Sequence, residues 1–461
     1  MVDLREPLDH LVRLPRTFTT GKSFVAPGAI RLYDDTLRDG EQMPGVAFSP
    51  EQKLELAILL SGIGVHVMDV AFPIVGESDR RSLQLCVQAQ REGKIRPDVE
   101  ILAMCRSNRG DLDCVAETMK AIGAPPDAVS VLVLSTLSDL HMKYKIGQVL
   151  LKQEGEKPEA WLDLPVEFFR KANIRMITRA VSTARELGFS RVEFAAEDAS
   201  RSNLDYDLEW ARACVAAGGT RMCFSDTCGV LTPEAVDYYF PPLVKALTPA
   251  TQITAHFHND FGIGAYNTVR ALSHGATHAG LCANGIGERA GNASLHQIVM
   301  ILKELYGIEL PGFKYDWLVE LRRAVERMSG IAVQVNEPII GEGVYSHESG
   351  IHTSGILINP AIYQFIREEA VGGTQRFVFG KHTGTASVEH VLHKNEAALK
   401  AAGIAIDDAL VKRLTAEVKD LREERMRTGT HERFIDEYYR NYHALGISEE
   451  ELLHLALGKK P

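Results

Sequence analysis

The chain has 461 residues, of which 45% are hydrophobic and 24% are charged, a composition typical of an ordinary water-soluble globular protein. Its formal net charge of −10 argues against a nucleic-acid scaffold, because phosphate binding needs a local excess of lysine and arginine. No stretch approaches the ~20 apolar residues of a membrane span, and residues 1–18 lack the apolar core of a signal peptide. Seven scattered cysteines without a zinc or disulfide spacing suit a reducing compartment. We therefore expect a cytoplasmic protein with neither nucleic-acid nor membrane partners.

Short β-like runs alternate with longer helical patterns between residues 29 and 305. The predicted strands are Ala29–Tyr33, Val67–Ala71, Val99–Ala103, Ala128–Leu134, Arg191–Phe194, Arg221–Ser225, Gln252–Ala255 and His278–Ala283. Helical patterns between them include Pro50–Ser61, Leu112–Ile122, Ile174–Leu187, Leu208–Ala217, Pro233–Ala246, Ala265–Ser273 and Ser294–Leu305. Eight such units match a closed (β/α)8 TIM barrel, an α/β fold. A doubly wound open sheet is the alternative, since both folds read as repeated strand–helix units.

The alternation fades after about Tyr306. Helices are predicted there at Tyr315–Met328, Ile404–Arg427 and His431–Leu445, with a turn-rich segment at Val371–Gly384. We therefore expect three regions, namely an N-terminal extension at 1–28, the barrel at 29–305, and a mainly helical C-terminal lid and extension at 306–461. Within the barrel, the polar stretch Lys152–Pro158 predicts a surface excursion after the fourth strand.

Two motifs more than two hundred residues apart carry the chemistry. Leu37–Gln42 follows the first predicted strand, and His256–Asp260 follows the seventh. Residues i and i+2 of an extended segment share a face, so His256 and His258 can point at one centre. With Asp39 they make two imidazoles and one carboxylate, a set that binds one divalent ion and leaves positions open for substrate. Zinc, manganese, iron and magnesium all suit these donors.

Polar residues follow other predicted strands as well. Glu197 and Asp198 follow the fifth strand, where acid–base work or support of a metal ligand competes with an ordinary solvated loop. Thr227 ends the sixth strand, and its hydroxyl suits a substrate carboxylate. The glycine-rich stretch Asn284–Asn292 superficially imitates a dinucleotide fingerprint, but it follows the eighth strand instead of opening the first. We interpret it as a tight turn that places Asn284 beside the metal.

Together these motifs resemble the acyl-CoA-condensing branch of the DRE-TIM metallolyases, which includes 2-isopropylmalate, homocitrate and citramalate synthases. The matching segments are Leu37–Lys53, Ser138–His141, Glu197–Ala199, Asp226–Thr227, His256–Gly262, Asn284–Asn292, His347–His352 and Gly380–His382. The resemblance covers roughly residues 28–390, and the ordered co-occurrence of the motifs is highly specific.

The resemblance implies a role for each matched residue. It implies that Asp39, His256, His258 and Asn284 hold a divalent ion such as Mn, Mg, Zn or Co. It implies catalytic roles for Arg38, Glu197, His352 and Tyr363, and substrate binding by Gln42, Asp69, Arg106, His141 and Thr227. The segment with His352 and Tyr363 would be a lid shared between the subunits of a homodimer.

The implied reaction uses acetyl-CoA as cosubstrate. A 2-keto acid chelates the ion, a base removes a proton from the acetyl methyl group, and the enolate attacks the keto carbon. Water then cleaves the thioester. Arg38 and the ion would place positive charge where negative charge develops.

Three residues depart from the family pattern around the keto-acid pocket. Asp69 stands where relatives usually carry Glu, Ala71 replaces a common Gly, and Tyr266 replaces a small residue. These departures bear on the choice of keto acid, for which the candidates are 2-ketoisovalerate, pyruvate, 2-oxoglutarate, aromatic keto acids, and phosphono- or phosphinopyruvate. The chain also ends at Pro461, so we expect no leucine-binding regulatory domain and no inhibition by leucine.

Three alternatives to this condensation stay open. A 3-hydroxy-3-methylglutaryl-CoA (HMG-CoA) lyase resembles the chain around the metal but uses a cysteine after the eighth strand, and residues 285–292 contain none. A non-haem iron oxygenase uses the same two histidines and one carboxylate. The third alternative is a catalytically inactive binding module.

Overall fold

The computed structural model describes residues 24–427 and 430–457, which divide into two compact units. The barrel unit runs through Lys314 and also includes Leu321–Ser329. The C-terminal unit consists of Tyr315–Glu320 and the described residues from Gly330 onward. Residues 1–23, most of the expected N-terminal extension, lie outside the described range.

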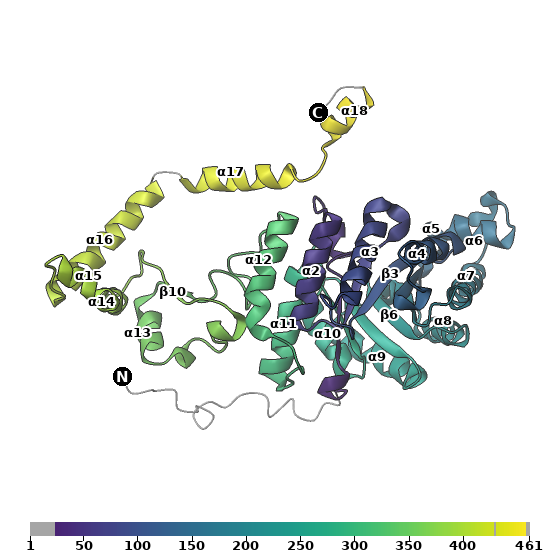
Figure 1. Ribbon diagram of the computed structural model, residues 1–461, viewed down its shortest axis with the longest axis horizontal. Coiled ribbons are helices and arrows are strands. Elements are labelled where there is room, and N and C mark those ends of the chain that lie inside the picture. The colour runs from purple at the N-terminus through teal and green to yellow at the C-terminus, as the bar shows by residue number, and fades with distance from the viewer. Residues whose placement is uncertain (1–23, 428–429, 458–461) are drawn as a thin grey trace. The chain divides into compact units, whose positions relative to one another are not determined.

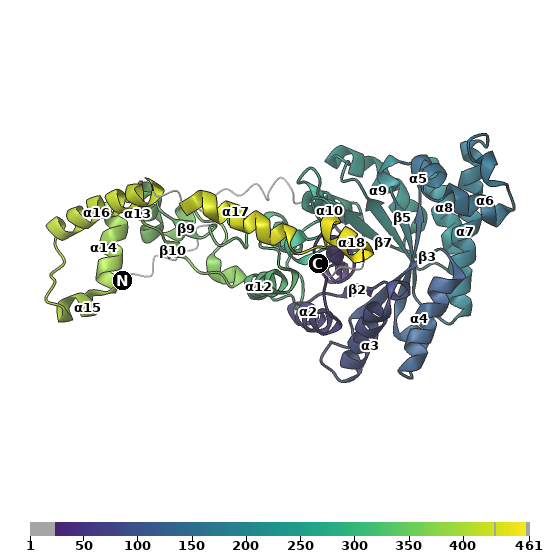
Figure 2. The ribbon, with the colours of Figure 1, turned by 90° about the horizontal axis from the view of Figure 1, so that it is seen from above.

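Eight parallel strands close into a barrel in chain order (Figures 1 and 2). The strands are β1 (Arg31–Asp34), β2 (Val67–Ala71), β3 (Glu100–Arg106), β4 (Ser130–Thr136), β5 (Val192–Glu197), β6 (Arg221–Asp226), β7 (Gln252–Phe257) and β8 (His278–Leu281). The predicted (β/α)8 barrel is confirmed, and the open sheet is excluded because β8 pairs with β1 along Arg31–Asp34. Each predicted strand is present with ends shifted by a few residues; β3 runs on to Arg106, beyond its predicted end at Ala103.

Helices surround the strands (Figure 2). They are α2 (Pro50–Ile63), α3 (Glu77–Arg91), α4 (Arg109–Ala121), α5 (Asp139–Tyr144), α6 (Gly147–Glu154), α7 (Val166–Glu186), α8 (Leu204–Ala216), α9 (Pro233–Leu247), α10 (Gly264–Ser273), α11 (Leu295–Met300) and α12 (Leu318–Ser329). Local sequence sets their ends: Ser49 and Gln52 form a capping box at α2, and Gly64 ends that helix with a φ of +122°. Because helices cover one face and the interior covers the other, all five residues of β2 are buried.

The barrel interior is stacked in layers along the strands. Near their amino ends, the buried Arg221 guanidinium lies 2.6 Å from a Glu193 oxygen and 2.7 Å from a Glu100 oxygen. Buried charges need such partners, because desolvation of an unpaired ion costs several kcal/mol. An apolar layer that includes Leu132 and Ala195 follows. The polar side chains described below lie at the carboxyl ends.

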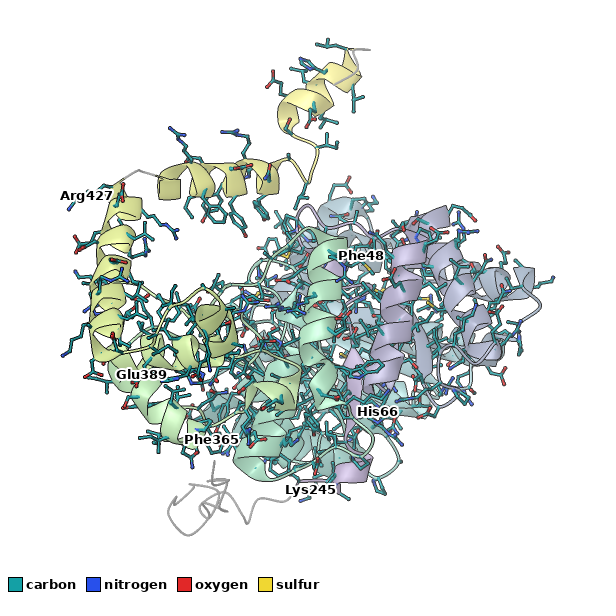
Figure 3. The ribbon with its side chains drawn as sticks, turned by 60° about the vertical axis from the view of Figure 1, so that its left-hand side comes forward. Phe48, His66, Lys245, Phe365, Glu389 and Arg427 are labelled. Atoms are coloured by element: carbon teal, nitrogen blue, oxygen red, sulfur yellow. The ribbon has the colours of Figure 1, made fainter. Side chains whose placement is uncertain are left out.

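The C-terminal unit is mainly helical, as predicted. It contains α13 (Gly350–Ile358), α14 (Thr385–Lys394), α15 (Glu396–Ala401), α16 (Asp408–Arg427), α17 (Thr430–His443) and α18 (Glu449–Ala456), and the short strands β9 (Ser346–His347) and β10 (Arg376–Phe377). Figure 3 marks Glu389 on α14 and Arg427 at the end of α16. Among the described residues of both units, no helix combines the length and apolarity required to cross a membrane.

Candidate metal centre and active-site cavity

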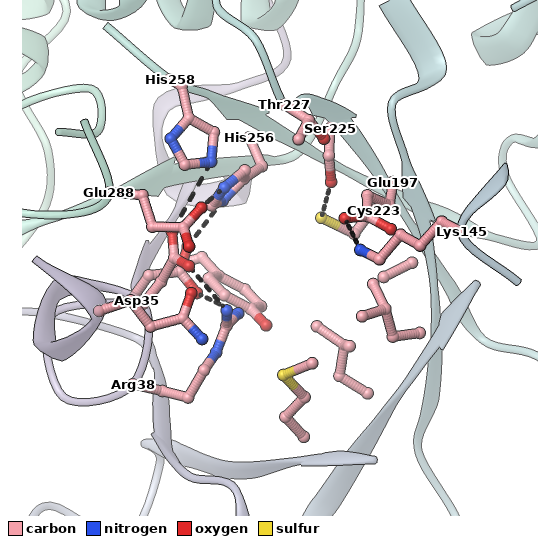
Figure 4. A pocket seen from close by; sticks show the side chains of 17 residues that line it. Asp35, Arg38, Lys145, Glu197, Cys223, Ser225, Thr227, His256, His258 and Glu288 are labelled. Carbon is pink, nitrogen blue, oxygen red and sulfur yellow. Dashed lines mark hydrogen bonds and ion pairs between the residues drawn. The ribbon is translucent and has the colours of Figure 1, made fainter. Parts of the chain in front are cut away.

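A cavity of about 270 Å³ lies at the carboxyl ends of the strands, where TIM barrels carry their active sites. Figure 4 shows its two polar walls. We call one the histidine wall, which consists of Asp35, Arg38, Asp39, His256 and His258. The opposite wall, here the Glu197 wall, consists of Lys145, Glu197, Ser225 and Thr227. The lining thus combines residues that lie in the last part of β5, β6 and β7 or follow β1, β4, β6 and β7.

Three candidate ligands of the histidine wall converge as predicted. Asp39, His256 and His258 are all buried, and their ligand atoms lie within 4.8 Å of one another. Asp39 Oδ2 is 3.6 Å from His256 Nε2 and 3.9 Å from His258 Nε2. Atoms that each bind one ion at about 2.1 Å lie roughly 3 to 3.5 Å apart, so only a small adjustment is needed. The set therefore fits a divalent cation.

A buried carboxylate orients the first histidine. His256 Nδ1 donates to Asp35 Oδ2 over 2.9 Å, which leaves Nε2 facing Asp39. Such carboxylate–histidine pairs fix the ring and its tautomer in metal sites. Burial would lower the pKa of His256, but the Asp35 and Asp39 carboxylates together outweigh it and raise that pKa. Burial lowers the pKa of His258 to about 4, so this imidazole is neutral and ready to bind a metal near neutral pH.

Arg38 is fixed by three carboxylates. Its Nε donates to Asp69 over 2.6 Å, while its two terminal nitrogens donate to Asp39 over 3.0 Å and to Asp35 over 3.3 Å. Burial would raise the pKa of Asp39, but Arg38 and both histidines outweigh it and lower that pKa to about 2. Asp39 therefore stays a carboxylate throughout the physiological range.

The asparagine beside the triad is Asn292, which corrects our expectation for Asn284. The Asn284 amide donates to the backbone carbonyl of Arg322 over 3.0 Å and is not among the cavity-lining residues. The buried Asn292 donates from Nδ2 to Asp39 Oδ2 over 2.7 Å, and its backbone forms a bridge with that of His258. Its Oδ1 is buried without a partner, so a rotation of the amide would offer a hard oxygen ligand at the triad.

The Glu197 wall is organised around one carboxylate. Glu197 Oε1 is 2.5 Å from Lys145 Nζ, and Oε2 is 3.7 Å from His141 Nδ1. Thr227 also lines the cavity, and its Oγ1 accepts a bond from the Asp198 amide. The predicted pocket residue His141 thus lies beside Glu197 but is not among the lining residues.

Of the remaining residues predicted for the site, some line the cavity and others do not. Gln42 lines the cavity, and its role in substrate binding stays a prediction. Asp69 is fully buried, accepts a hydrogen bond from Arg38, and is not among the cavity-lining residues. Arg106 is not among the cavity-lining residues, and one edge of its guanidinium, Nε and Nη2, donates to the two Asp111 oxygens, each over 2.9 Å. His352 and Tyr363 stack in the C-terminal unit with ring centroids 4.2 Å apart.

Several lining or supporting residues were missed by the sequence analysis. Asp35 and Glu288 carry no periodic signal, since they lie on turns after β1 and β8. Lys145 was not missed: with Lys143 it was noted in the sequence as a basic residue after His141 that could favour an additional anionic group on the substrate, and its place four residues after His141 puts it on the same helical face. Asn292 occurs in a motif that was noticed, but the path of a glycine-rich turn cannot be derived from its sequence.

Comparisons with known proteins agree with the fold and the motifs. An HMGL-like family model matches residues 29–325, and a homocitrate synthase post-HMGL domain-like model matches residues 339–426. A probable 2-isopropylmalate synthase of Ignicoccus hospitalis is 37% identical over 398 residues, which is 86% of this chain and 88% of that protein. A homocitrate synthase of Methanopyrus kandleri is 34% identical over 401 residues, covering 87% and 90%. A putative (R)-citramalate synthase of the same organism is 36% identical over 395 residues, covering 86% and 69%.

The chain therefore belongs to the DRE-TIM family of 2-isopropylmalate, homocitrate and citramalate synthases. Three differently named activities match at similar identity, so similarity alone does not select a substrate. A solved HMG-CoA lyase of Bacillus subtilis is 19% identical with a TM-score of 0.51, covering 68% of this chain and 97% of that one. The similarity to this solved structure shows that the two proteins share a fold.

Proposed function

We propose that this protein catalyses a divalent-metal-dependent condensation of acetyl-CoA with a 2-keto acid, followed by hydrolysis of the thioester. One observation carries the proposal: Asp39, His256 and His258 converge beside Arg38 and face Glu197 across one cavity, in a chain of the synthase family. The relatives' names describe synthases of isopropylmalate, homocitrate and citramalate. These products are hydroxy acids of the kind that such a condensation forms.

The candidate ion site would use Asp39, His256 and His258, with the amide oxygen of Asn292 as a further ligand. Mixed nitrogen and oxygen donors accept Mn, Mg, Zn or Co. A bound divalent ion would supply positive charge that stabilises the alkoxide developing on the keto oxygen.

The residues of the chain would bind substrate and move protons. Arg38 is fixed by Asp35, Asp39 and Asp69, so its charge is already oriented when negative charge develops on the keto oxygen. The Thr227 hydroxyl would hold the keto-acid carboxylate. Glu197 would accept the proton lost by the acetyl methyl group.

We further propose that His352 and Tyr363 assist the proton transfers, and that the protein works as a homodimer sharing its C-terminal lid. In the reaction, the methyl carbon loses a proton and forms a bond to the keto carbon, whose oxygen gains a proton. Water adds to the thioester carbonyl, the carbon–sulfur bond breaks, and CoA leaves as a thiol. The product is a 2-hydroxy dicarboxylic acid.

The cavity also favours one class of keto acid. Beside the polar walls it is lined by Met104, Leu132, Leu134, Ala195 and Cys223. Leu134, Ala195 and Cys223 are register partners on β4, β5 and β6, so they form a continuous apolar surface. We propose that this surface receives an uncharged hydrocarbon side chain of the keto acid, as in 2-ketoisovalerate or an aromatic keto acid.

The cations of the cavity support the same choice. Among its described lining residues, Arg38 and Lys145 are the basic side chains apart from the histidines, and each is already paired with carboxylates. A second carboxylate or a phosphonate on the keto acid would therefore lack a free cation, and its desolvation would be uncompensated. This argues against 2-oxoglutarate and phosphonopyruvate.

A thiol-release assay tests the proposal. Purified protein is incubated anaerobically with acetyl-CoA, a panel of keto acids and several divalent ions. We expect CoA release with hydrocarbon keto acids, loss of activity after chelation, and recovery when one ion is restored. The condensation would be refuted if none of the keto acids led to CoA release, or if the protein consumed oxygen in air in an iron-dependent way. Preference for 2-oxoglutarate would refute only the proposed substrate class.

A further inference from the structure

A lysine outside the predicted site contacts the carboxylate that is proposed as proton acceptor. Lys145 follows α5, and its ammonium lies 2.5 Å from Glu197 Oε1. Lys145 lines the cavity with a side chain that is 50% exposed, whereas the Glu197 side chain is 18% exposed. The ion pair therefore lies at the edge of the cavity, where both members can meet substrate.

A second lysine two residues earlier has a different role. Lys143 Nζ donates to the backbone carbonyl of Leu162 over 3.2 Å, and its ammonium lies 5.8 Å from the centre of the Phe169 ring. It therefore links the segment after α6 that contains Leu162 to α5. Trp161 strengthens this link, since its ring nitrogen donates to the Lys143 carbonyl over 2.5 Å. These contacts do not involve Glu197, so Lys143 offers a matched control for Lys145.

The other charges around Glu197 are already engaged. Arg201 binds both oxygens of Asp198 at 2.7 and 2.8 Å. His141 lies between the two acids, with Nδ1 3.7 Å from Glu197 and Nε2 3.5 Å from Asp198. Among the described neighbours of Glu197, Lys145 is consequently the one permanent cation that contacts it directly.

We propose that Lys145 is a positioning residue for Glu197: its ammonium holds one carboxylate oxygen, so that the carboxylate remains charged and fixed at the cavity edge. This inference rests on the proposed role of Glu197 as proton acceptor. Burial would raise the pKa of Glu197, but contacts with His141 and Lys145 outweigh it and lower that pKa. A mostly buried carboxylate thus remains deprotonated and ready to accept a proton.

The pH dependence of kcat/KM for CoA release tests the proposal with K145M, K145R and K143M. Removal of the cation raises the pKa of Glu197, so the acidic limb of the K145M profile should move to higher pH by about one unit or more. Above this limb the K145M rate should recover toward that of the wild type. K145R should keep the limb close to its original position. K143M, the matched control, should lower thermal stability without moving the limb.

Two outcomes would overturn the proposal: an unmoved acidic limb in K145M, or an equal shift in K143M. If K145M folds poorly, K145Q gives the same comparison with an uncharged hydrogen-bond donor. An infrared titration of the Glu197 carboxyl group, identified by subtraction of E197Q, gives a readout independent of activity. Failure of the wild type to release CoA would refute the proposed function, whereas an equal carboxyl pKa in wild type and K145M would refute the ion-pair role.

Discussion

The two polar walls of the cavity are built in different ways. In the histidine wall, Asp39, His256 and His258 are 4–7% exposed, and each of the first two is hydrogen-bonded to a further buried side chain. In the Glu197 wall, the Lys145 side chain is 50% exposed and makes a single ion pair. The first wall has a fixed geometry before any ligand arrives, whereas the second is partly solvated and depends on electrostatics.

This difference indicates how the two walls share the work. The proposed metal ligation would require atoms close to their final positions, and buried second contacts such as Asp35 would hold them there. Proton transfer requires a group that changes charge during turnover. Water near Glu197 can relax around that change, so partial exposure suits its proposed role. Variants of the first wall should therefore affect ion binding, and variants of the second should affect pH dependence.

The largest effect is expected for His258→Ala. Loss of one of the three candidate ligands should abolish stoichiometric ion binding and reduce CoA release by roughly 10³-fold or more, because several kcal/mol of charge stabilisation disappear. Metal analysis after gel filtration and the thiol assay measure both. His274→Gln is the control, since His274, which directly follows α10, bonds Asp237 on the outer helix α9. Full ion binding by H258A would contradict the assigned centre.

A smaller effect is expected for Asp35→Asn. The amide can still contact His256 but no longer stabilises its Nδ1 proton, so ion affinity should fall about 10- to 100-fold. Calorimetric titration of the metal-free protein measures this affinity. Asp98→Asn, at an exposed ion pair with Arg96, should leave it unchanged. An unchanged ion affinity in D35N would mean that the negative charge of Asp35 does not contribute to ion binding.

The next smaller effect is expected for Ala195→Leu, which should change the specificity for the keto acid. A larger side chain in the apolar surface should reduce kcat/KM for branched or aromatic keto acids about tenfold relative to pyruvate, since each methylene is worth roughly 1–3 kcal/mol. Leu134→Ala should act in the opposite direction. Competition assays with paired keto acids measure the ratio. If neither variant changes the ratio, the hydrocarbon side chain binds elsewhere.

The smallest effects concern the two asparagines of the glycine-rich turn. Asn284→Ala loses one hydrogen bond to the Arg322 carbonyl and should cost about 1 kcal/mol of unfolding free energy with ion affinity preserved. Asn292→Ala should instead weaken ion binding, because it removes the amide beside Asp39. Paired denaturation and metal titration separate the two roles. Weaker ion binding in N284A than in N292A would restore the original expectation.

The barrel and the convergence of its three candidate ligands could be predicted from the sequence because they depend on local periodicity. Buried runs at regular spacing predicted each strand, and the His256-x-His258 spacing on an extended segment predicted a shared direction. Parallel strands then bring their carboxyl ends together whatever the side chains are. The position of Asp39 shortly after β1 was enough to predict that it lies at this end of the barrel.

The supporting contacts could not be predicted, because they depend on backbone paths and packing. The turn after β8 places Asn284, Gly285 and Gly291 at φ values of +56°, +67° and +84°, and no periodic pattern encodes such a path. Likewise Arg106 had the right position for a pocket residue, but Asp111 pairs with it. Catalytic roles for His352 and Tyr363 remain predictions.

The most direct test of the metal centre is anomalous diffraction from crystals grown with Mn²⁺ or Co²⁺ and recorded at the absorption edge of the metal. We predict one strong peak about 2.1 Å from Asp39 Oδ2, His256 Nε2 and His258 Nε2, with Asn292 as the next nearest side chain. A peak at other residues, or no peak at the triad under saturating metal, would contradict the account.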